Sequence, residues 1–269
     1  MGRVMIRGVN DIASAVAHRL FLNGEAVVVH EREQPSVSRR GMAFADAIFA
    51  GRAELAGVTA VLVTDLTQVL PLLTARETIP VAVAELSALL AAVRPAVLVD
   101  ARMRKRAIPE TQRGLAPLTI GLGPNFVAGE TVDLAIETAW GADLGTVVAR
   151  GPTRPLAGEP RPLAGHGRDR YVYAPAAGVF RTRRRVGEAI MAGEIVAYLD
   201  ALPLSAPLDG VLRGLTHDGV PVASGTKVIE VDPRGADAAV EGIGERPDRI
   251  ANGVLNALSM WRASRREIG

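Results

Sequence analysis

The first segment that could do chemistry is a glycine turn, Gly8-Val9-Asn10-Asp11-Ile12-Ala13, which directly follows the apolar run Val4–Arg7. It approximates the G-x-G-x-x-G/A pattern that carries a strand into a helix: the first glycine makes the tight turn, and alanine is accepted at the third position. Backbone amides at a helix start attract phosphate. An asparagine replaces the second glycine, and its Cβ would crowd a pyrophosphate. The turn predicts an altered nucleotide site that contains Gly8, Asn10, Asp11 and Ala13.

Charged residues after the second apolar run, Ala26–His30, would extend that site. Glu31 stands about 20 residues past the glycine turn, where dinucleotide-binding proteins place a carboxylate for the ribose 2′-hydroxyl. Arg39 and Arg40 precede the next helical pattern, and guanidinium forks suit phosphate or carboxylate oxygens. One alternative function is therefore an NAD(P)-dependent oxidoreductase, although the chain offers no obvious proton-transfer pair for it.

A second charged group follows the fifth apolar run. Asp100, Arg102 and Lys105 come directly after Ala96–Val99. The glycines of the sixth run, Gly121 and Gly123, would offer backbone amides at the same edge, because ligands of open α/β sheets bind beyond the carboxyl ends of the strands. The group would suit an anionic ligand such as a phosphate or a pterin pyrophosphate. The alternative is a solvated run of charges.

The elements that must position these residues alternate between short β-branched runs and amphipathic stretches, which predicts a parallel sheet covered by helices. We expect strands at Val4–Arg7, Ala26–His30, Ala60–Val63, Val81–Ala84, Ala96–Val99 and Leu118–Gly121. We expect helices at Asp11–Leu22, Met42–Ala50, Leu66–Thr74 and Leu86–Val93. The predicted fold class is α/β, with a Rossmann-like domain over residues 1–149.

The C-terminal third contains an internal repeat. The segment Ala174-Pro-Ala-Ala-Gly-Val recurs 32 residues later as Ala206-Pro-Leu-Asp-Gly-Val, and later glycines and valines keep the same offset. Such repeats indicate two structural units packed by pseudo-symmetry. The pattern resembles a biotinyl/lipoyl-like barrel-sandwich domain, whose central hairpin carries an acylated lysine. The corresponding connection, Asp200–Ala206, contains no lysine, so we expect neither covalent biotin nor lipoate.

The predicted organisation has four parts. The α/β domain is followed by a Pro/Gly-rich linker over 150–168, which includes His166 with no assigned role. A barrel-sandwich hybrid domain covers 169–235. The remainder, 236–269, contains a C-terminal helix whose apolar face would pack on the α/β domain.

Composition excludes several classes of protein. The sequence has no cysteine, which rules out disulfides and thiolate metal sites, and we expect no metal site of another kind. Its 31 basic and 29 acidic residues nearly balance and form no basic stripe, so nucleic-acid binding is not expected. No apolar run is long enough to span a membrane, and the start lacks the apolar core of a signal peptide. We expect a cytoplasmic protein.

Several motifs together resemble the YqeB family, proteins linked to selenium-dependent molybdenum hydroxylase systems. They are Ile6–Ser14, Arg39-Arg40 before Ala43-Phe44, Val99–Arg106, Thr119–Gly129, Ile136–Thr138, Leu144-Gly145 and Val231–Gly235. The family is in turn similar to xanthine dehydrogenase accessory (XdhC-type) proteins in its Rossmann-like half. The chain departs from the family at Gly8–Asp11, where G-A-G-D is usual, and at Ala139–Ala142, where Arg-Gly-His is frequent.

The resemblance implies an accessory or maturation factor for a molybdenum hydroxylase. Its ligand would be a molybdopterin-type cofactor or a dinucleotide, and its partners would be the hydroxylase or its maturation proteins. No catalytic residue is implied. A non-catalytic protein-interaction module is the second alternative, and self-association is compatible with the sequence.

Overall fold

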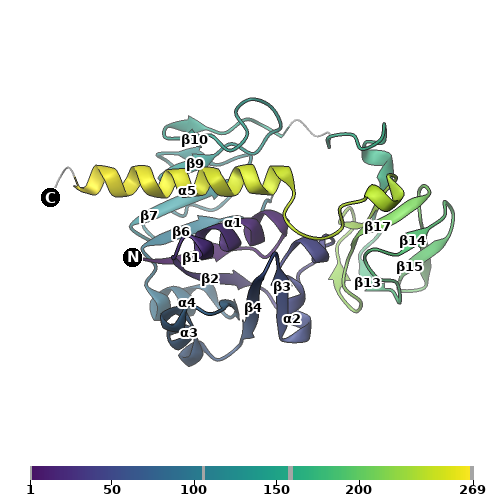
Figure 1. The fold of residues 1–269 in the computed structure, drawn as a ribbon, viewed down its shortest axis with the longest axis horizontal. Coiled ribbons are helices and arrows are strands. Elements are labelled where there is room, and N and C mark those ends of the chain that lie inside the picture. The colour runs from purple at the N-terminus through teal and green to yellow at the C-terminus, as the bar shows by residue number, and fades with distance from the viewer. Residues whose placement is uncertain (1, 105–106, 157–159, 267–269) are drawn as a thin grey trace.

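The computed structural model describes residues 2–104, 107–156 and 160–266. Within these residues the larger part of the chain is a nine-stranded sheet in the order β10-β9-β7-β6-β1-β2-β5-β4-β3 (Figure 1). Its strands are β1 (Arg3–Arg7), β2 (Ala26–Glu31), β3 (Arg52–Leu55), β4 (Val58–Val63), β5 (Ile79–Val83), β6 (Val97–Asp100), β7 (Leu118–Leu122), β9 (Leu134–Ile136) and β10 (Val147–Val148). A separate short ladder pairs β8 (Val127–Ala128) with β11 (Gly151–Pro152).

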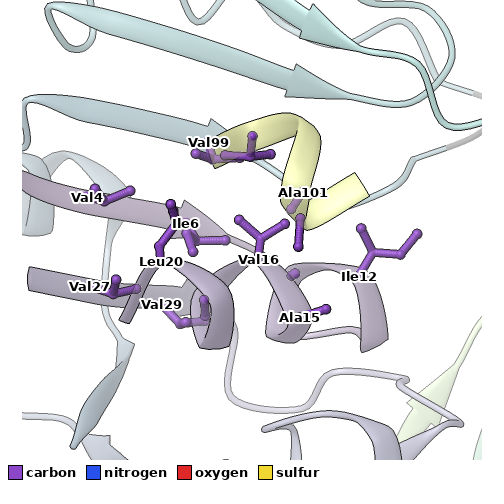
Figure 2. Close-up of a cluster of buried hydrophobic side chains, with 14 of the residues drawn as sticks. Val4, Ile6, Ile12, Ala15, Val16, Leu20, Val27, Val29, Val99 and Ala101 are labelled. Carbon is purple, nitrogen blue, oxygen red and sulfur yellow. The ribbon is translucent and has the colours of Figure 1, made fainter. Parts of the chain in front are cut away.

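Helices cover both faces of the sheet. They are α1 (Asp11–Leu22), α2 (Asp46–Ala50), α3 (Val69–Ala75), α4 (Leu86–Val93) and α5 (Glu245–Arg266), with short 3-10 turns η1 (Arg40–Met42), η2 (Leu66–Gln68), η3 (Arg168–Arg170) and η4 (Gly235–Asp237). Side chains alternate along β1, so Val4 and Ile6 pack on the α1 face while Met5 packs on the α3 and α4 face. Figure 2 shows the first of these layers, in which α1 lies over β1, β2 and β6.

The long C-terminal helix α5 lies beside α1 on the same face of the sheet (Figure 1). Its buried residues recur at helical spacing, with Ile250, Val254 and Leu258 in the same hydrophobic cluster as Val16 and Leu20. The final segment of the chain therefore completes the core that the first forty residues begin.

The predicted fold class is wrong in the arrangement of its sheets. The large sheet is mixed, because β3 runs antiparallel to β4 and β10 runs antiparallel to β9. The β3–β4 turn takes positive φ at Ala56 and Gly57, as a two-residue hairpin requires. An alanine at the first of these positions is not typical of such a turn, so the sequence did not predict the hairpin or the antiparallel strand β3.

The predicted barrel-sandwich domain is also corrected. Residues 171–232 form two four-stranded antiparallel sheets, in the orders β12-β19-β17-β14 and β16-β15-β13-β18, which we call the paired-sheet unit. The strands are β12 (Tyr171–Tyr173), β13 (Gly178–Arg181), β14 (Ala189–Ile190), β15 (Ile195–Leu199), β16 (Leu202–Ser205), β17 (Gly210–Leu215), β18 (Pro221–Val222) and β19 (Lys227–Asp232).

The 32-residue repeat explains the order of strands in the paired-sheet unit. Each strand of the first copy, β12 to β15, has its counterpart in β16 to β19, and the two sheet orders match under that exchange. Each sheet takes two strands from each copy. One copy alone therefore cannot form either complete sheet, and it cannot bury the shared core residues Phe180 and Leu212.

The paired-sheet unit lies beyond the carboxyl ends of the parallel strands (Figure 1). The Leu215 amide donates to the Ser38 carbonyl at 2.7 Å, and the rings of Phe49 and His217 stack with centroids 3.9 Å apart. The ligand edge that the sequence predicts is therefore a junction between the two parts of the chain. None of the helices in the described ranges is long and apolar enough to cross a membrane.

Candidate functional site

The Gly8 turn carries β1 into α1 as the sequence predicts. Gly8 has φ +109°, and a Cβ at this position would lie 3.0 Å from the Ala101 carbonyl oxygen, so only glycine fits without strain. The same close approach brings the turn against the chain after β6: the Asn10 side-chain amide donates to the Ala101 carbonyl at 2.8 Å. The first turn and the Asp100–Arg102 segment therefore share one edge.

The amides of this turn already have partners within the protein. The Asn10 side-chain oxygen caps α1 and accepts from the Ile12 and Ala13 amides at 3.0 and 3.1 Å. A Glu31 carboxylate oxygen accepts from the Val9 amide at 3.2 Å. A phosphate on the α1 amides would have to displace Asn10. Glu31 lies beside the turn as predicted, but it binds the backbone there.

Gly121 and Gly123 also lie near this edge, yet their role is packing. Gly121 is a buried residue of β7 paired with Asp100 of β6, and a Cβ on it would lie 2.3 Å from the Phe126 ring. The Gly123 amide donates to the Ile136 carbonyl at 3.4 Å, and a Cβ on Gly123 would lie 3.2 Å from the end of the Met103 side chain. Both glycines belong to the predicted edge, and both are buried beneath neighbouring residues.

The group with the most concentrated charge at this edge is what we call the edge cluster, defined as Arg7, Asp100, Arg102, Arg104 and Glu110. Arg7 and Asp100 are register partners at the ends of β1 and β6. Both are buried, with 6% and 2% of their surface exposed. Arg102 forms a fork on Asp100, with its Nε 3.0 Å from the carboxylate. Buried Gln112 fixes the Arg7 guanidinium through a 2.6 Å hydrogen bond.

Three guanidiniums converge on one carboxylate in the edge cluster. Glu110 accepts from Arg7 at 3.1 Å, from Arg102 at 2.6 Å and from Arg104. Its side chain is 48% exposed, unlike that of Asp100. Partial burial would raise the pKa of Glu110, but the hydrogen bonds from Arg104 and Arg102 outweigh it and hold that pKa far below the usual range. Glu110 is therefore ionised at every physiological pH.

Sequence reasoning found only part of this cluster. It selected Asp100 and Arg102, and it also selected Lys105, which lies outside the described residues. It missed the members Arg7, Arg104 and Glu110, and it missed Gln112, which binds Arg7. Arg7 was detectable in principle, because a charged residue that ends a buried strand stands at the ligand edge. Glu110 gave no such signal, because it lies in an irregular segment between β6 and β7.

A second group of charges lies where the sheet meets the paired-sheet unit. We define this junction cluster as Asp11, Arg39, Arg170, Arg213, Lys227, Glu230, Asp232, Arg234 and Arg246. Its centre is Glu230, which is fully buried. Arg39 forms a fork on Glu230 at 2.9 and 3.0 Å, and Arg170 and Lys227 bind the same carboxylate at 2.5 and 2.8 Å.

The junction cluster takes up two residues that the sequence assigned to a cofactor. Arg39 bridges Asp11, at 2.9 Å, and Glu230, so it links α1 to β19. Burial alone would raise the pKa of Asp11, but Arg39 and Lys227 lower it. Arg40 instead pairs with Asp46 at 3.3 Å beside α2, apart from both clusters.

Burial raises the pKa of a carboxyl group such as Asp11, but it lowers the pKa of Lys227, the one lysine that the structure describes. It lowers the pKa of Lys227 to about 8, assisted by Arg39 and opposed by Glu230. The Lys227 ammonium also lies 4.6 Å from the centroid of the Tyr171 ring. Burial raises the pKa of Tyr171, because the charged form of tyrosine is the deprotonated one, and Glu230 raises this pKa further.

Two surface cavities lie away from both clusters. A cavity of about 850 Å³ lies at the opposite edge of the sheet, among residues that include Arg3, Arg94 and Pro117. Another, of about 660 Å³, lies between the β3–β4 turn and Glu241. Among the residues that the structure describes, no group of three His, Asp or Glu side chains is placed to hold a metal ion.

Comparison with known proteins identifies the family. The chain is 40% identical over 257 residues to the uncharacterized protein YqeB of Escherichia coli strain K12, and the match covers 96% of the chain. This chain belongs to the YqeB family. It spans about half the length of that relative, 47%. No family model matches the sequence. Because the relative is described as uncharacterized, the comparison gives no support to the molybdenum-related role that the resemblance implied.

Solved structures give only distant likenesses to this YqeB-family chain. An aspartoacylase family protein from Mesorhizobium loti matches with 11% identity and a TM-score of 0.24, covering 85% of this chain and 84% of that one. A succinylglutamate desuccinylase/aspartoacylase from Rhodobacter sphaeroides matches with 15% identity and a TM-score of 0.21, covering 76% and 57%. At these TM-scores the likenesses carry no inference about activity. The corrected fold rests on the sheet order alone.

Proposed function

We propose that this YqeB-family chain binds a small anionic ligand at the edge cluster, where a phosphate or carboxylate group of the ligand takes the place of Glu110. We further propose that it acts as an accessory protein for an enzyme that uses this ligand. The first proposal rests on the convergence of Arg7, Arg102 and Arg104 on one half-exposed carboxylate. The second rests on the sequence resemblance alone.

Several features of the edge cluster support a replaceable anion. Buried Asp100 and Gln112 hold Arg102 and Arg7 in place independently of Glu110, so the guanidiniums stay oriented if Glu110 leaves. Guanidinium forks match the oxygens of phosphates and carboxylates. Glu110 lies in an irregular segment and exposes half of its side chain, so it can move toward solvent without disturbing a strand. The protein thus supplies an internal carboxylate where an external anion would bind.

The geometry favours this proposal over an NAD(P)-dependent oxidoreductase. A dinucleotide would need the α1 amides and the Glu31 carboxylate, and these groups bind Asn10 and Val9 respectively. The remaining alternative is an interaction module in which the same charges only dock a protein partner. Small-ligand titration separates the two, because a docking module would bind no member of the ligand panel.

The test is calorimetric titration of the purified chain with inorganic phosphate, ATP, NAD and a pterin phosphate. We expect at least one of them to bind, and Arg102→Gln to weaken that binding by about tenfold or more, since a charge-assisted hydrogen bond contributes about 1.5–3 kcal/mol. We expect Glu110→Gln to strengthen binding, because it removes the competing negative charge.

The matched control is Arg113→Gln, which removes an arginine that pairs with Asp133 at 3.0 Å outside the cluster. It should leave binding unchanged. The proposal fails if none of the four ligands binds, or if Glu110→Gln weakens binding as much as Arg102→Gln does.

A further inference from the structure

His30 ends β2 directly beside the arginine that ends β1 (Figure 1). The register pairs Arg7 with His30 on one side and with Asp100 on the other, so the three residues form one row across neighbouring parallel strands. Side chains alternate between the faces of a sheet, so residues two positions apart on a strand share a face. The residues two positions before this row lie in one hydrophobic cluster: Met5, Val28 and Leu98. His30 therefore leaves the sheet on the same face as Arg7 and Asp100 of the edge cluster.

Only one of the two ring nitrogens of His30 has a partner. Nε2 lies 2.9 Å from the Ala84 carbonyl, and because a carbonyl can only accept, Nε2 carries the proton. Nδ1 of the neutral ring is then an acceptor, and it makes no hydrogen bond to any residue that the structure describes. Ala84 follows β5, which lies on the side of β2 away from β1. The two ring nitrogens direct their hydrogen bonds in nearly opposite directions, so Nδ1 is turned toward the side of Arg7.

The surroundings of His30 keep the ring neutral. Burial lowers the pKa of His30 below its ordinary value of 6.5, and the positive charges of Arg7 on β1 and Arg102 after β6 lower it further. The bond to the Ala84 carbonyl and the charge of Glu31 on the same strand act in the opposite direction without reversing the shift. At pH 7 and above, Nδ1 is therefore able to accept a hydrogen bond from a hydroxyl group.

The arginines of the edge cluster match a phosphate group better than the carboxylate they hold. One Glu110 oxygen accepts from both Arg7, at 3.1 Å, and Arg102, at 2.6 Å, while the other accepts from Arg104. A carboxylate thus gives three guanidinium groups only two oxygens, whereas the phosphate of an ester has three, one for each. His30 lies one strand beyond Arg7, and neighbouring strands are about 4.8 Å apart. That spacing is comparable to the separation of the phosphorus from the hydroxyl on the second carbon in glycerol 3-phosphate.

We propose that the ligand of the edge cluster is a phosphate ester with a hydroxyl on the carbon next to the ester carbon, as in glycerol 3-phosphate or a sugar phosphate, and that this hydroxyl donates to Nδ1 of His30. This inference rests on the function proposed above, to which it adds the class of ligand and a residue that determines specificity. An ester without the hydroxyl displaces water from Nδ1 and leaves that nitrogen unpaired, so it binds more weakly.

The experiment compares glycerol 3-phosphate with propyl phosphate by calorimetric titration of the full chain at pH 8. Both esters are dianions at this pH, and they differ only in their hydroxyl groups. We expect glycerol 3-phosphate to bind about fivefold more tightly, as one net hydrogen bond allows. His30→Phe should weaken the binding of glycerol 3-phosphate to that of propyl phosphate and leave propyl phosphate unchanged. His166→Phe is the matched control and should keep the preference, because His166 binds Asp169 in the segment before β12.

A pH series on the natural chain tests the same contact without a substitution. An imidazolium ring has no acceptor, so the preference for glycerol 3-phosphate should fall toward unity as the pH drops through the lowered pKa of His30. The ratio of the two affinities is the quantity to follow, because the phosphate groups of both esters titrate alike. His30→Asn supplies an amide oxygen that does not titrate, so this variant should keep part of the preference at every pH.

The outcomes separate this inference from the function on which it rests. Equal affinities for the two esters, with both weakened by Arg102→Gln, would overturn the role of His30 and leave the anion site in place. A preference that persists in His30→Phe would also overturn it, because the hydroxyl would then have another partner. If neither ester binds while another anion does, the proposed ligand class is wrong, and if no anion binds, the proposed function fails with it.

Discussion

The edge cluster and the junction cluster use the same chemistry in different surroundings. In each, arginines converge on a glutamate: Arg7, Arg102 and Arg104 on Glu110, and Arg39 and Arg170 on Glu230. The two carboxylates differ in exposure, since the Glu110 side chain is 48% exposed and that of Glu230 is fully buried. Glu110 lies in an irregular segment, whereas Glu230 lies within β19 and takes part in its ladder.

The difference in exposure distinguishes a site that can bind another anion from a structural joint, by which we mean an ion pair that holds two parts of the chain together. A buried carboxylate cannot leave its arginines without leaving several charges unpaired in a region of low polarity. An exposed carboxylate in a loop can exchange its arginines for water at little cost. The same residue types therefore hold the two parts of the chain together at Glu230 and leave an anion position replaceable at Glu110.

The largest expected effect comes from removing the central charge of the junction cluster. Glu230→Gln leaves Arg39, Arg170 and Lys227 without their shared counter-charge, so we expect the free energy of unfolding to fall by about 3–5 kcal/mol. Chemical denaturation measures this loss. Glu188→Gln is the control, because its pair with Arg184 is partly exposed, with 3.6 Å between the charged atoms, and should contribute about 0–1 kcal/mol. Equal losses in the two variants would remove the distinction between buried and exposed carboxylates.

The pH dependence of the free energy of unfolding tests whether the junction cluster lowers the pKa of Lys227. The folded pKa of Lys227 is about 8, below the ordinary 10.5, so between these values the unfolded chain binds more protons than the folded chain. Stability attributable to Lys227 should therefore rise as pH increases from 8 toward 10. Above 10 the raised pKa of Tyr171 acts in the opposite direction, which sets the upper limit of the window.

The measurement is the free energy of unfolding at several pH values within this window, for the natural chain and for Lys227→Met. The variant should show a flatter profile. Lys105→Met, at the other lysine of the sequence, is the control and should keep the natural slope. Parallel profiles for the natural chain and Lys227→Met would show that Lys227 titrates as a solvated amine.

Asn10 is a third residue that binds groups predicted to bind a ligand, and unlike Glu110 and Glu230 it carries no charge. Its side chain caps α1 through the Ile12 and Ala13 amides. Asn10→Ala should lower stability by about 1 kcal/mol, whereas Asn10→Gly should cost only a few tenths, because glycine is an acceptable cap. Asn10→Gly also restores the second glycine of the phosphate-binding pattern. Thermal denaturation of both variants measures the cap, and an Asn10→Ala variant as stable as the natural chain would show that the Asn10 bonds to α1 contribute nothing.

The sequence predicted the local elements of the first half better than their assembly. The helices at Asp11–Leu22 and Leu86–Val93 have the predicted bounds, because apolar spacing and flanking residues mark them clearly. The strands that make the sheet mixed are short, and the turn at Ala56 takes a left-handed conformation that alanine rarely signals. The repeat predicted two structural units packed by pseudo-symmetry, but the repeat does not indicate that each sheet combines strands from both copies.

The candidate site was predictable only where strand ends determine position. Asp100, Arg102 and Gly8 meet at one edge because parallel strands end together. Arg39 is a different case, since its partner Glu230 is 191 residues away and only the docking of the paired-sheet unit brings them together. Long-range ion pairs of this kind leave no local pattern, so the sequence assigned Arg39 and Asp11 to a ligand.

The smallest stability effect is expected at Glu110, and it bears most directly on the difference between the two clusters. Glu110→Gln should change the free energy of unfolding by at most about 1 kcal/mol, because the carboxylate is half exposed and Gln112 and Asp100 still bind Arg7 and Arg102 once its charge is removed. Urea denaturation alongside Glu230→Gln makes the comparison within one protein. A small loss at Glu110 means that its place among the arginines can pass to another anion without weakening the fold. A loss as large as that at Glu230 would instead make the edge cluster a second structural joint, and the proposed binding function would lose its basis.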